Sequence, residues 1–575
     1  MTYREAYETW LKEFADDRAT VDELKAIAGD EKEIEDRFYT ELSFGTAGMR
    51  GVLGAGTNRM NVFTVGKATQ GYANYLKAHF AAPSVAIAYD SRINSRLFAE
   101  TAAGVFAANG IRVYIYPRLM PTPSLSFAVR DLRSCGGVVV TASHNPAKYN
   151  GYKVYWAHGG QAAPEQAAAI YACIGKVPFF SAKTCDFDAA VRDGRIGMIG
   201  AEEDAAYYEV TRSVLLAPAR LKEKGATLPI VYTPLHGAGN IPVRTLLQQA
   251  GMTQVFVVPE QELPDGTFPT VTAPNPENPD AFRLAKALAD EKGATVILAT
   301  DPDSDRLGVA VKRHDGEWAV LSGNQIACIL LEHILSGRKA QGTLPDNGVV
   351  VKSIVSTTLA DAIAARYGAA LENVLTGFRF ISEKIDAYEK SGEKTFLFGF
   401  EESYGFLAGG FSRDKDAICA AVLAAEACLC YAERGMTLYD ALQEIYRSYG
   451  FYKEKQTSYT LEGKEGMERI ARCMSGLRAA PPEMFAGVRV NVFEEYKTGV
   501  RMARGKTPER IELPRSDMLR FLLEDGAWVA VRPSGTEPKL KLYIGANAAK
   551  EDALDALLGR LFDDLDALLR RELRM

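Results

Sequence analysis

The segment from residue 85 to 116 alternates strand, loop, helix and strand patterns, and this alternation restricts the fold more than any other feature. Val85 to Tyr89 is an apolar run that predicts a buried strand, residues 94–109 have a helical pattern, and residues 112–116 predict a second strand. Such elements pack as a mainly parallel sheet covered by helices, and ligands collect at the carboxyl ends of its strands. We therefore expect an α/β fold whose site lies where the strands end.

A candidate nucleophile follows another predicted strand. Residues 138–140 are three valines that predict a buried strand, and the polar turn T-A-S-H-N-P follows from residue 141 to 146, where Pro146 prevents a helix. A further strand is predicted over residues 152–156. This pattern places Ser143 at an exposed tip between two rigid elements, where a reactive hydroxyl could act.

A second polar loop carries three carboxylates, Asp301, Asp303 and Asp305, directly after an apolar strand pattern. Alternating positions in an extended loop bring such oxygen ligands to one side, and they suit Mg²⁺. A calcium-binding EF-hand loop needs Gly and Glu at its sixth and twelfth positions, where Arg306 and Lys312 stand. A haloacid-dehalogenase phosphatase needs Thr or Val where Asp305 stands. Both alternatives fail, so a magnesium loop is the better interpretation.

A third loop near the C-terminus has the groups that hold a phosphate monoester. Arg532 offers a bidentate fork, Ser534 and Thr536 offer hydroxyls, and Gly535 exposes a backbone N–H. The Gly-x4-Gly-Lys-Ser/Thr string of a P-loop is absent from the sequence. The pattern therefore predicts a phosphate site of a different kind.

Composition limits the partners and the compartment. The 575 residues are 47% hydrophobic and 24% charged, which is typical of roughly three to five globular domains. A net charge of -6 argues against a nucleic-acid or anionic membrane partner. The stretch from Ala417 to Ala432 contains Glu426 and is too short to span a bilayer, so we expect a buried helix. Eight scattered cysteines and an N-terminus without an apolar signal segment favour a cytoplasmic protein with reduced thiols.

Four motifs occur in an order that resembles the α-D-phosphohexomutases, the phosphoglucomutase and phosphomannomutase family. They are F-G-T-A-G-M-R-G at 44–51, T-A-S-H-N-P at 141–146, D-P-D-S-D-R at 301–306 and R-P-S-G-T-E-P at 532–538. The resemblance implies an α/β fold with three related α/β domains and a C-terminal α+β, TATA-binding-protein-like domain around a central cleft. We expect a polar connector over 449–460, and domains at 1–212, 213–325, 326–450 and 451–575.

The resemblance also implies roles for particular residues. Ser143 is expected to carry a phosphoryl group, and its phosphate would join Asp301, Asp303 and Asp305 around one Mg²⁺ per chain. The expected catalytic residues are Ser143, Lys153, Arg50, His144 and Arg306. The expected substrate-binding residues are Thr376, Gly377, Glu401, Ser403, Lys415, Arg532, Ser534, Gly535 and Thr536. Arg379 stands where the family usually has lysine, and Phe400 is inserted in the sugar loop, so the contact of Arg379 stays open.

The implied reaction is the reversible interconversion of glucose 1-phosphate and glucose 6-phosphate through a glucose 1,6-bisphosphate intermediate, with mannose phosphates as further candidate substrates. The E-E-S form of the sugar loop is more typical of glucose-type members. The alternatives are a phosphopentomutase or a sugar-1,6-bisphosphate synthase on the same scaffold, and, more distantly, a non-catalytic phosphosugar-binding protein. The expected partners are small sugar phosphates, and the expected assembly is a monomer or weak homodimer.

Overall fold

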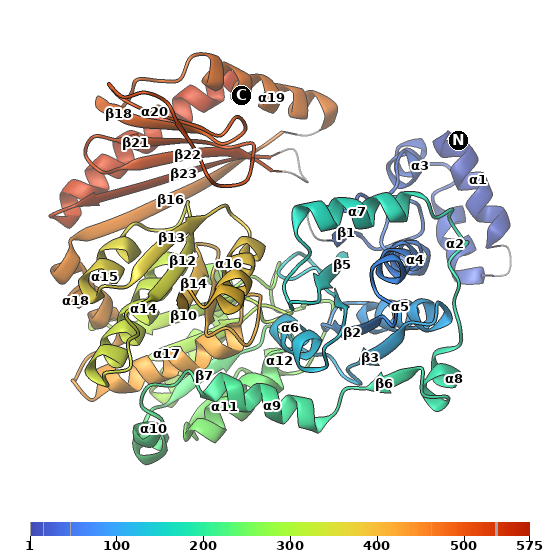
Figure 1. Cartoon of the computed structure of the whole chain (residues 1–575), viewed down its shortest axis with the longest axis horizontal. Coiled ribbons are helices and arrows are strands. Elements are labelled where there is room, and N and C mark those ends of the chain that lie inside the picture. Colours follow the sequence, from blue (N-terminus) through green and yellow to red (C-terminus); the bar gives the residue numbers. More distant parts are fainter. Residues whose placement is uncertain (1, 15–16, 46–47, 462, 535–538) are drawn as a thin grey trace.

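The computed structural model describes residues 2–14, 17–45, 48–461, 463–534 and 539–575, whose strands form four main β-sheets. The sheets follow one another along the chain, from the blue unit on the right of Figure 1 to the red unit at the top left. The first three are mixed sheets with helices, and the fourth is antiparallel. The predicted fold of three α/β units and a C-terminal α+β unit is therefore confirmed.

The first unit has the strand order β1-β5-β4-β2-β3-β6. Strands β4, β2, β3 and β6 are mutually parallel, whereas β5 pairs antiparallel with β4 and β1. The valines of residues 138–140 are wholly buried, as expected for a strand covered on both faces. The elements are α1 (Tyr3–Glu13), α2 (Arg18–Ala26), α3 (Glu31–Phe38), β1 (Gly48–Val52), α4 (Val62–His79), β2 (Ser84–Tyr89), α5 (Ser95–Ala108), β3 (Arg112–Ile115), α6 (Thr122–Asp131), β4 (Gly136–Val140), β5 (Tyr149–Trp156), α7 (Pro164–Gly175), α8 (Phe187–Arg192) and β6 (Ile196–Met198).

The second unit repeats this plan with a five-stranded sheet of order β11-β10-β9-β7-β8. Strands β9, β7 and β8 are parallel, and β10 and β11 extend the sheet antiparallel. Its elements are α9 (Ala201–Arg212), α10 (Pro218–Lys224), the short 3-10 helix η1 (Gly225–Thr227), β7 (Ile230–Thr233), α11 (Asn240–Ala250), β8 (Val255–Val257), α12 (Pro259–Glu262), η2 (Pro279–Phe282), α13 (Arg283–Lys292), β9 (Val296–Thr300), β10 (Leu307–Lys312) and β11 (Trp318–Val320).

The third unit has a four-stranded sheet of order β13-β12-β14-β15, in which only the β14–β15 pairing is antiparallel. Its elements are α14 (Gly323–Ala340), β12 (Gly348–Ser353), α15 (Leu359–Tyr367), β13 (Ala370–Val374), α16 (Phe378–Ser391), β14 (Thr395–Glu401), β15 (Gly405–Ala408), α17 (Ala417–Ala432) and α18 (Leu438–Tyr449).

The second and third units share one hydrophobic core. Leu246 of α11 and Leu330 of α14 belong to the same buried cluster as most of α17. The prediction that residues 417–432 form a buried helix is therefore confirmed. Glu426 is wholly buried within α17, and its carboxylate accepts hydrogen bonds from the backbone N–H groups of Leu216 and Ala217. These bonds explain how an acidic residue is tolerated in the core.

The C-terminal unit shows where one prediction is wrong. The polar connector expected over 449–460 is instead β16, which pairs with β23 along its whole length. One face of this sheet packs under α20, and on the other face Trp528, Ala530 and Tyr543 pack with Phe378 of the third unit. The elements are β16 (Phe451–Thr460), α19 (Gly463–Ala479), β17 (Met484–Phe485), β18 (Val488–Glu495), β19 (Val500–Ala503), β20 (Glu509–Arg510), β21 (Leu519–Leu523), β22 (Trp528–Pro533), β23 (Lys539–Ala548) and α20 (Glu551–Leu573).

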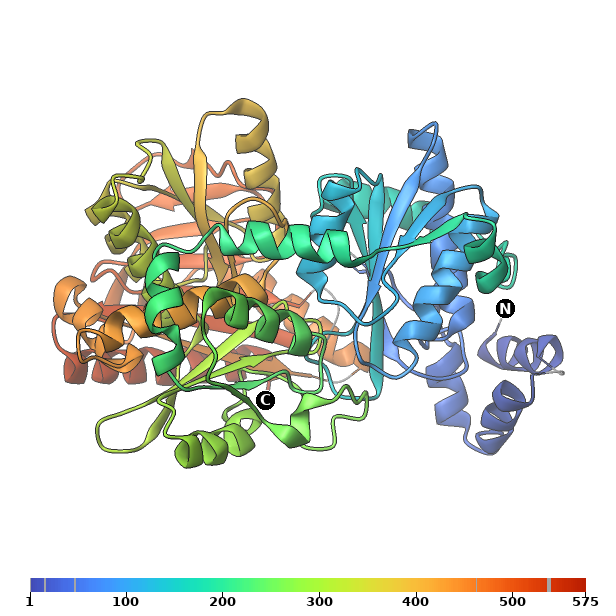
Figure 2. The same cartoon turned by 90° about the horizontal axis from the view of Figure 1, so that it is seen from below.

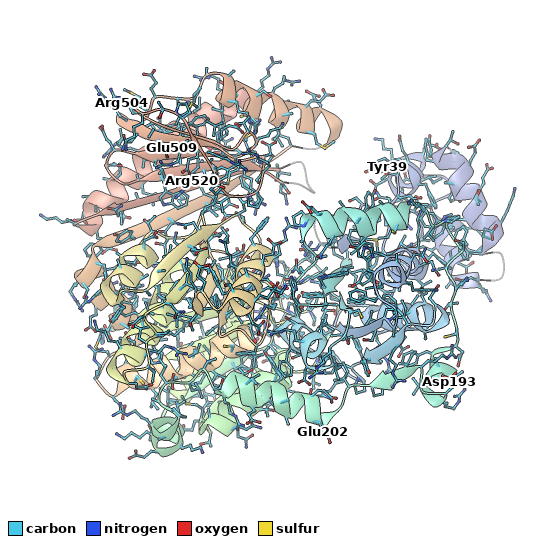
Figure 3. The ribbon with its side chains drawn as sticks, in the orientation of Figure 1. Tyr39, Asp193, Glu202, Arg504, Glu509 and Arg520 are labelled. Atoms are coloured by element: carbon cyan, nitrogen blue, oxygen red, sulfur yellow. The ribbon has the colours of Figure 1, made fainter. Side chains whose placement is uncertain are left out.

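Helices at the N-terminus and between the first two units complete the arrangement. Helices α1 to α3 pack through Trp10 against Phe63 and Phe179 of the first unit. Helix α9 runs between the two halves of the molecule in both ribbon views (Figure 2). Tyr39 after α3 and Glu202 in α9 lie at the periphery (Figure 3). Among the described residues, no helix combines the length and the apolar character needed to cross a bilayer.

Candidate active site

The Ser143 loop is held from beneath by a chain of hydrogen bonds. The backbone N–H of Ser143 donates to Thr141 Oγ1 at 2.8 Å, and Thr141 Oγ1 donates to Asp90 Oδ2 at 2.6 Å. Ser143 itself has φ of 51°, an uncommon conformation for a residue other than glycine. The prediction of an exposed tip is wrong, because Ser143 is only 3% exposed and the acidic loop of the second unit covers it.

A buried arginine fixes the same loop. The guanidinium of Arg92 is fully buried at the end of β2 and donates to the carbonyl oxygens of Ser143 (2.6 Å), Pro146 (3.0 Å), Tyr149 (2.9 Å) and Asn145. Burial lowers the pKa of Arg92 from its ordinary value, although nearby carboxylates act in the opposite direction. A guanidinium has five N–H donors in a planar arrangement, so a single arginine can hydrogen-bond several backbone carbonyl groups at once.

The three aspartates after β9 converge beside Ser143. Asp301, Asp303 and Asp305 are buried, and one carboxylate oxygen from each lies within 4.8 Å of the others. Ser143 Oγ donates to Asp301 Oδ2 at 2.6 Å, although the two residues come from different units. The buried oxygens Asp303 Oδ1 and Asp305 Oδ1 have no hydrogen-bond partner among the described residues. Two unpartnered carboxylate oxygens in a buried acidic cluster are what a bound cation would satisfy.

The electrostatics of the aspartate triplet also favour a bound cation. Burial raises the pKa of Asp301 well above its usual range, and the charges of Asp303 and Asp305 raise it further. Thr122 Oγ1, at the start of α6, donates to Asp303 Oδ2 at 2.9 Å, so the first unit also contributes to the cluster. The triplet could bind a metal ion, and a cation there would relieve the repulsion among the carboxylates.

Two lysines from different units reach the triplet. Nζ of Lys153 on β5 donates to Asp303 Oδ2 at 2.7 Å, and Nζ of Lys415 after β15 lies 3.1 Å from Asp305 Oδ2. Burial lowers the pKa of Lys415, but Asp305 and other nearby carboxylates more than offset this and raise it above its ordinary value. A Cβ on Gly405 would lie 2.0 Å from Lys415 Cδ, so glycine is needed for the lysine to pass.

Arg50 and His144 also contact residues of the Ser143 loop. Arg50 on β1 donates from Nη1 to Asn145 Oδ1 at 3.0 Å, while His144 Nδ1 lies 3.2 Å from Ser143 Oγ. Burial lowers the pKa of His144 well below its ordinary value, and the charge of Arg306 lowers it further. The lowered pKa favours the neutral imidazole, which could exchange a proton at Ser143 Oγ.

Arg306 joins the acidic triplet to a further loop of the second unit. Its guanidinium pairs with Glu277, and its Nε lies 3.9 Å from Asp305 Oδ1. Burial lowers the pKa of Arg306, but Glu277 and the aspartates together raise it above its ordinary value. Glu277 was not predicted from the sequence as a site residue.

The predicted sugar loop brings Glu401 and Gly377 together. Glu401 is buried at the end of β14, and its Oε1 accepts a hydrogen bond from the backbone N–H of Gly377 at 2.7 Å. The adjacent Thr376 Oγ1 is buried without a hydrogen-bond partner among the described residues. Ser403 is half-buried in the turn after the strand. The two loops after β13 and β14 therefore offer a buried carboxylate and a buried hydroxyl, followed by the half-buried Ser403.

The predicted phosphate loop lies at the end of β22 in the C-terminal unit. Arg532 and Ser534 are half-buried, and Gly535 and Thr536 lie outside the described residues. Burial lowers the pKa of Arg379, the charge of Glu401 raises it, and that of Arg532 lowers it. The charges of both the sugar loop and β22 therefore act on Arg379, whose guanidinium carbon lies 4.8 Å from the ring centre of Phe380.

The same strained backbone conformation recurs at each of the three α/β sheets. Ser143, Ser304 and Tyr404 have φ values of 51°, 52° and 65°, and they follow β4, β9 and β14 respectively. Non-glycine residues with positive φ cost roughly 1–3 kcal/mol each and cluster at functional loops. The three strand ends thus bring together a hydroxyl, a carboxylate cluster and two ammonium groups. This chemistry suits transfer of a phosphoryl group.

Comparison with known proteins agrees with this geometry. Four domain descriptions match the chain: "Phosphoglucomutase/phosphomannomutase, alpha/beta/alpha domain I" at residues 41–180, domain II at 207–316, domain III at 322–449 and the C-terminal domain at 488–559. A Staphylococcus saprophyticus protein named phosphoglucomutase is 37% identical over 527 residues, which cover 91% of this chain and 94% of that protein.

Solved structures share the fold at lower identity. A phosphoglucomutase/phosphomannomutase family protein from Burkholderia thailandensis superposes with a TM-score of 0.65 at 19% identity, covering 92% of this chain and 97% of that one. The open form of pp63/parafusin from Paramecium superposes with a TM-score of 0.68 at 17% identity, covering 93% and 96%. The chain therefore belongs to the phosphoglucomutase/phosphomannomutase family.

Proposed function

We propose that this enzyme is a phosphoglucomutase that interconverts glucose 1-phosphate and glucose 6-phosphate. The observation that carries the proposal is the 2.6 Å hydrogen bond between Ser143 Oγ and Asp301, because it places the hydroxyl at a carboxylate cluster that could hold a charge-neutralising metal ion, as phosphoryl transfer needs. The relative from Staphylococcus saprophyticus, named phosphoglucomutase and similar over nearly its whole length, supports glucose phosphates as substrates.

Ser143 carries the phosphoryl group in the resting enzyme. The bond between phosphorus and Ser143 Oγ breaks as a bond forms to the free hydroxyl of the sugar phosphate, which yields glucose 1,6-bisphosphate. The intermediate turns around, and Ser143 Oγ then takes the other phosphoryl group. The proton that leaves the sugar hydroxyl needs an acceptor. The imidazole of His144 can accept it directly, and Lys153 can do so once its ammonium has lost a proton.

The acidic triplet fits one Mg²⁺ per chain, since two of its buried oxygens have no partner among the described residues. Asp301, Asp303 and Asp305 would hold the ion, and the phosphate on Ser143 would be a further ligand. When bound, the ion would neutralise charge on the transferring group. Arg50 and Arg306 supply further positive charge from the chain itself.

The sugar and its second phosphate are held by the remaining loops. Glu401 and Ser403 hydrogen-bond the sugar hydroxyls, and the backbone and hydroxyl at Gly377 and Thr376 contribute, as does Lys415. Arg379 takes the place of the family lysine between the sugar loop and Arg532. The non-reacting phosphate is bound by Arg532, Ser534, Gly535 and Thr536.

A coupled assay tests the proposal. Glucose 6-phosphate should form from glucose 1-phosphate in the presence of Mg²⁺, and added glucose 1,6-bisphosphate should increase the rate because it phosphorylates Ser143. Absence of turnover with both compounds present would overturn the proposed reaction. Release of glucose 1,6-bisphosphate as the main product would instead indicate a bisphosphate synthase.

Comparison of sugars tests the substrate assignment. The 3- and 4-hydroxyls have the same configuration in glucose and mannose, whereas galactose inverts the 4-hydroxyl. A site that hydrogen-bonds these hydroxyls rejects a misplaced one, because its own buried groups lose their partners. We expect glucose 1-phosphate to be the best substrate, mannose 1-phosphate to be used more slowly, and galactose 1-phosphate to be poor. A pentose phosphate with a tenfold higher kcat/KM than glucose 1-phosphate would identify a phosphopentomutase.

A further inference from the structure

One strand of the first unit contacts both the second and the third unit. Lys153 and Tyr155 are alternate residues of β5, so their side chains leave the same face of the strand. Nζ of Lys153 donates to Asp303 Oδ2 of the second unit at 2.7 Å. The hydroxyl of Tyr155 donates to Asp414 Oδ2 of the third unit at 2.6 Å. Strand β5 therefore joins the acidic triplet to Asp414, the residue that directly precedes Lys415.

The two carboxylate oxygens of Asp414 have different partners. The residue is 1% exposed, and its Oδ2 also accepts a hydrogen bond from Gln161 Nε2 of the first unit at 2.8 Å. Its Oδ1 accepts the backbone N–H of Lys415 at 2.8 Å and lies 3.6 Å from Lys415 Nζ. One oxygen thus binds the first unit and the other binds Lys415, so a change on the first-unit side would alter the orientation of the carboxylate that holds the lysine.

The core of the first unit fixes the position of the Tyr155 hydroxyl. Tyr155 is fully buried and belongs to the same hydrophobic cluster as Leu125 of α6 and Val139 of β4. Burial raises the pKa of Tyr155 well above its ordinary value, and the charge of Asp414 raises it further, so the hydroxyl keeps its proton. A donor on a packed ring holds its acceptor in one orientation.

The ammonium group of Lys415 lies between two carboxylates. Its Nζ is 3.1 Å from Asp305 Oδ2 of the second unit and 3.6 Å from Asp414 Oδ1. A lysine has a flexible stem, so the position of its ammonium group depends on the charged groups that it contacts. Asp305 belongs to the acidic triplet, whereas Asp414 can orient the ammonium group without being part of that cluster.

We propose that Asp414 is a positioning residue, which Tyr155 and Gln161 orient so that it holds the ammonium group of Lys415 beside the acidic triplet. The inference rests on the proposed function, in which Lys415 contributes to substrate binding, and it adds three residues that lie outside the four sequence motifs. Because Lys153 and Tyr155 leave one strand, β5 sets the spacing between the two ammonium groups. The first unit thus positions a lysine of the third unit through a fully buried tyrosine.

Kinetics of Tyr155→Phe give the first test, with Tyr207→Phe as a matched control. Tyr207 on α9 is also fully buried, and its hydroxyl donates to Asp416, the acidic residue on the other side of Lys415. The carboxylate of Asp416 caps α17 by accepting the backbone N–H of Cys419 at 2.9 Å. We expect kcat/KM for glucose 1-phosphate to fall about tenfold in Tyr155→Phe and to stay within about twofold of wild type in Tyr207→Phe. Equal kcat/KM in the two folded variants would overturn the proposal.

A double-mutant cycle with Lys415→Met separates positioning from a general structural role. If Tyr155 acts through Lys415, Tyr155→Phe should lower kcat/KM by about tenfold in the wild-type background but by less than about twofold in the Lys415→Met background. Asp414→Asn, which keeps the size of the side chain, should show the same dependence on Lys415. A full loss that persists in the Lys415→Met background would overturn the proposal.

Hydrogen exchange gives a second test that needs no turnover. Asp414 Oδ1 accepts the backbone N–H of Lys415, so this amide should exchange about tenfold faster in Tyr155→Phe than in wild type, and at the wild-type rate in Tyr207→Phe. Mass spectrometry of the peptide that spans residues 411–416 measures the rate. Equal exchange in Tyr155→Phe and wild type would overturn the proposal even if the enzyme is active. Faster exchange in Tyr155→Phe, together with a wild-type enzyme that lacks mutase activity, would support the positioning role and refute the proposed reaction.

Discussion

The two ends of the proposed substrate site are built in opposite ways. At the Ser143 end, Lys153 and Lys415 pair with the aspartates, and the hydroxyl of Ser143 is hydrogen-bonded to Asp301. At the other end, Arg532 on β22 lies directly opposite Lys541 on β23, and no described residue forms an ion pair with either of them. The chemical end is thus preorganised by contacts between units before substrate arrives. The anchoring end is completed by the phosphate itself, so changes at the two ends should affect kcat and KM differently.

Loss of the metal site should give the largest effect. Asp303→Asn removes a charge from the triplet, so we expect kcat to fall at least a thousandfold and EDTA to abolish wild-type activity, with recovery on addition of Mg²⁺. The assay is glucose 6-phosphate formation at saturating substrate, and circular dichroism checks that the variant is folded. Full activity in excess EDTA would show that the reaction at the Ser143 end does not use a metal ion.

Loosening the serine loop should give a smaller loss. Thr141→Val removes the hydroxyl that links Ser143 N–H to Asp90, and misplacement of a nucleophile by about 1 Å can cost a hundredfold in rate. We expect kcat to fall about ten- to a hundredfold with KM nearly unchanged. Ser95→Ala is the matched control, because it removes the other hydroxyl that donates to Asp90 and leaves the loop contact intact. Equal losses of kcat in both variants would mean that the hydroxyls act only by stabilising Asp90, and that the contact with the Ser143 N–H has no separate role.

At the anchoring end, the effect should appear in KM. Arg532→Ala removes a charge-assisted contact to the phosphate, so KM for sugar 1- and 6-phosphates should rise by about ten- to a hundredfold. Phosphorylation of Ser143 by glucose 1,6-bisphosphate at high concentration should still be detected by intact mass. A fall in kcat with no change in KM would reverse the comparison between the two ends.

The smallest effect concerns stability where the C-terminal sheet meets the third unit. Burial raises the pKa of Glu454 on β16 to about 7 from 4.5, although Asn324 donates to its carboxylate at 3.0 Å. A raised pKa means that the folded state holds a proton that the unfolded state has lost, so stability falls as pH rises from about 4.5 through about 7. A rise of the pKa from 4.5 to about 7 corresponds to at most about 3 kcal/mol of unfolding free energy for this half-buried group.

The measurement for Glu454 is the melting temperature at pH 5 and pH 8. Glu454→Gln cannot ionise, so its melting temperature relative to wild type should rise by a few degrees between the two pH values. Gln retains the acceptor for Asn324, which keeps the hydrogen bond comparable. A difference that stays constant with pH would show that Glu454 does not titrate in this range.

The elements that carry the chemistry could be predicted because their signals are local. Apolar runs marked β4, β9 and β14, and the polar residues that follow them lie at the strand ends as expected. The convergence of Asp301, Asp303 and Asp305 follows from their alternation in one loop. These features depend on residues that are close together in the sequence, so local composition and spacing were sufficient to predict them.

Features that depend on distant segments could not be predicted in the same way. Ser143 is buried because a loop from the second unit covers it, and nothing near residue 143 indicates that cover. Strand β16 has a polar, exposed pattern because it lies at an edge of the sheet, and its partner β23 begins far along the chain. Tyr155 gains its proposed role only because the fold brings its hydroxyl to Asp414, a residue 259 positions later in the chain.

The central claim is that Ser143 holds the phosphoryl group that is exchanged with the sugar. Peptide mass spectrometry tests this directly: the enzyme is phosphorylated with glucose 1,6-bisphosphate and Mg²⁺, freed of the bisphosphate, and analysed before and after incubation with excess glucose 1-phosphate or, as the control, excess glucose. We predict one phosphate on the peptide that contains Ser143, its transfer to added glucose 1-phosphate but not to glucose, and no phosphate in Ser143→Ala. Mutase turnover by Ser143→Ala at a rate near that of the wild type would contradict the account.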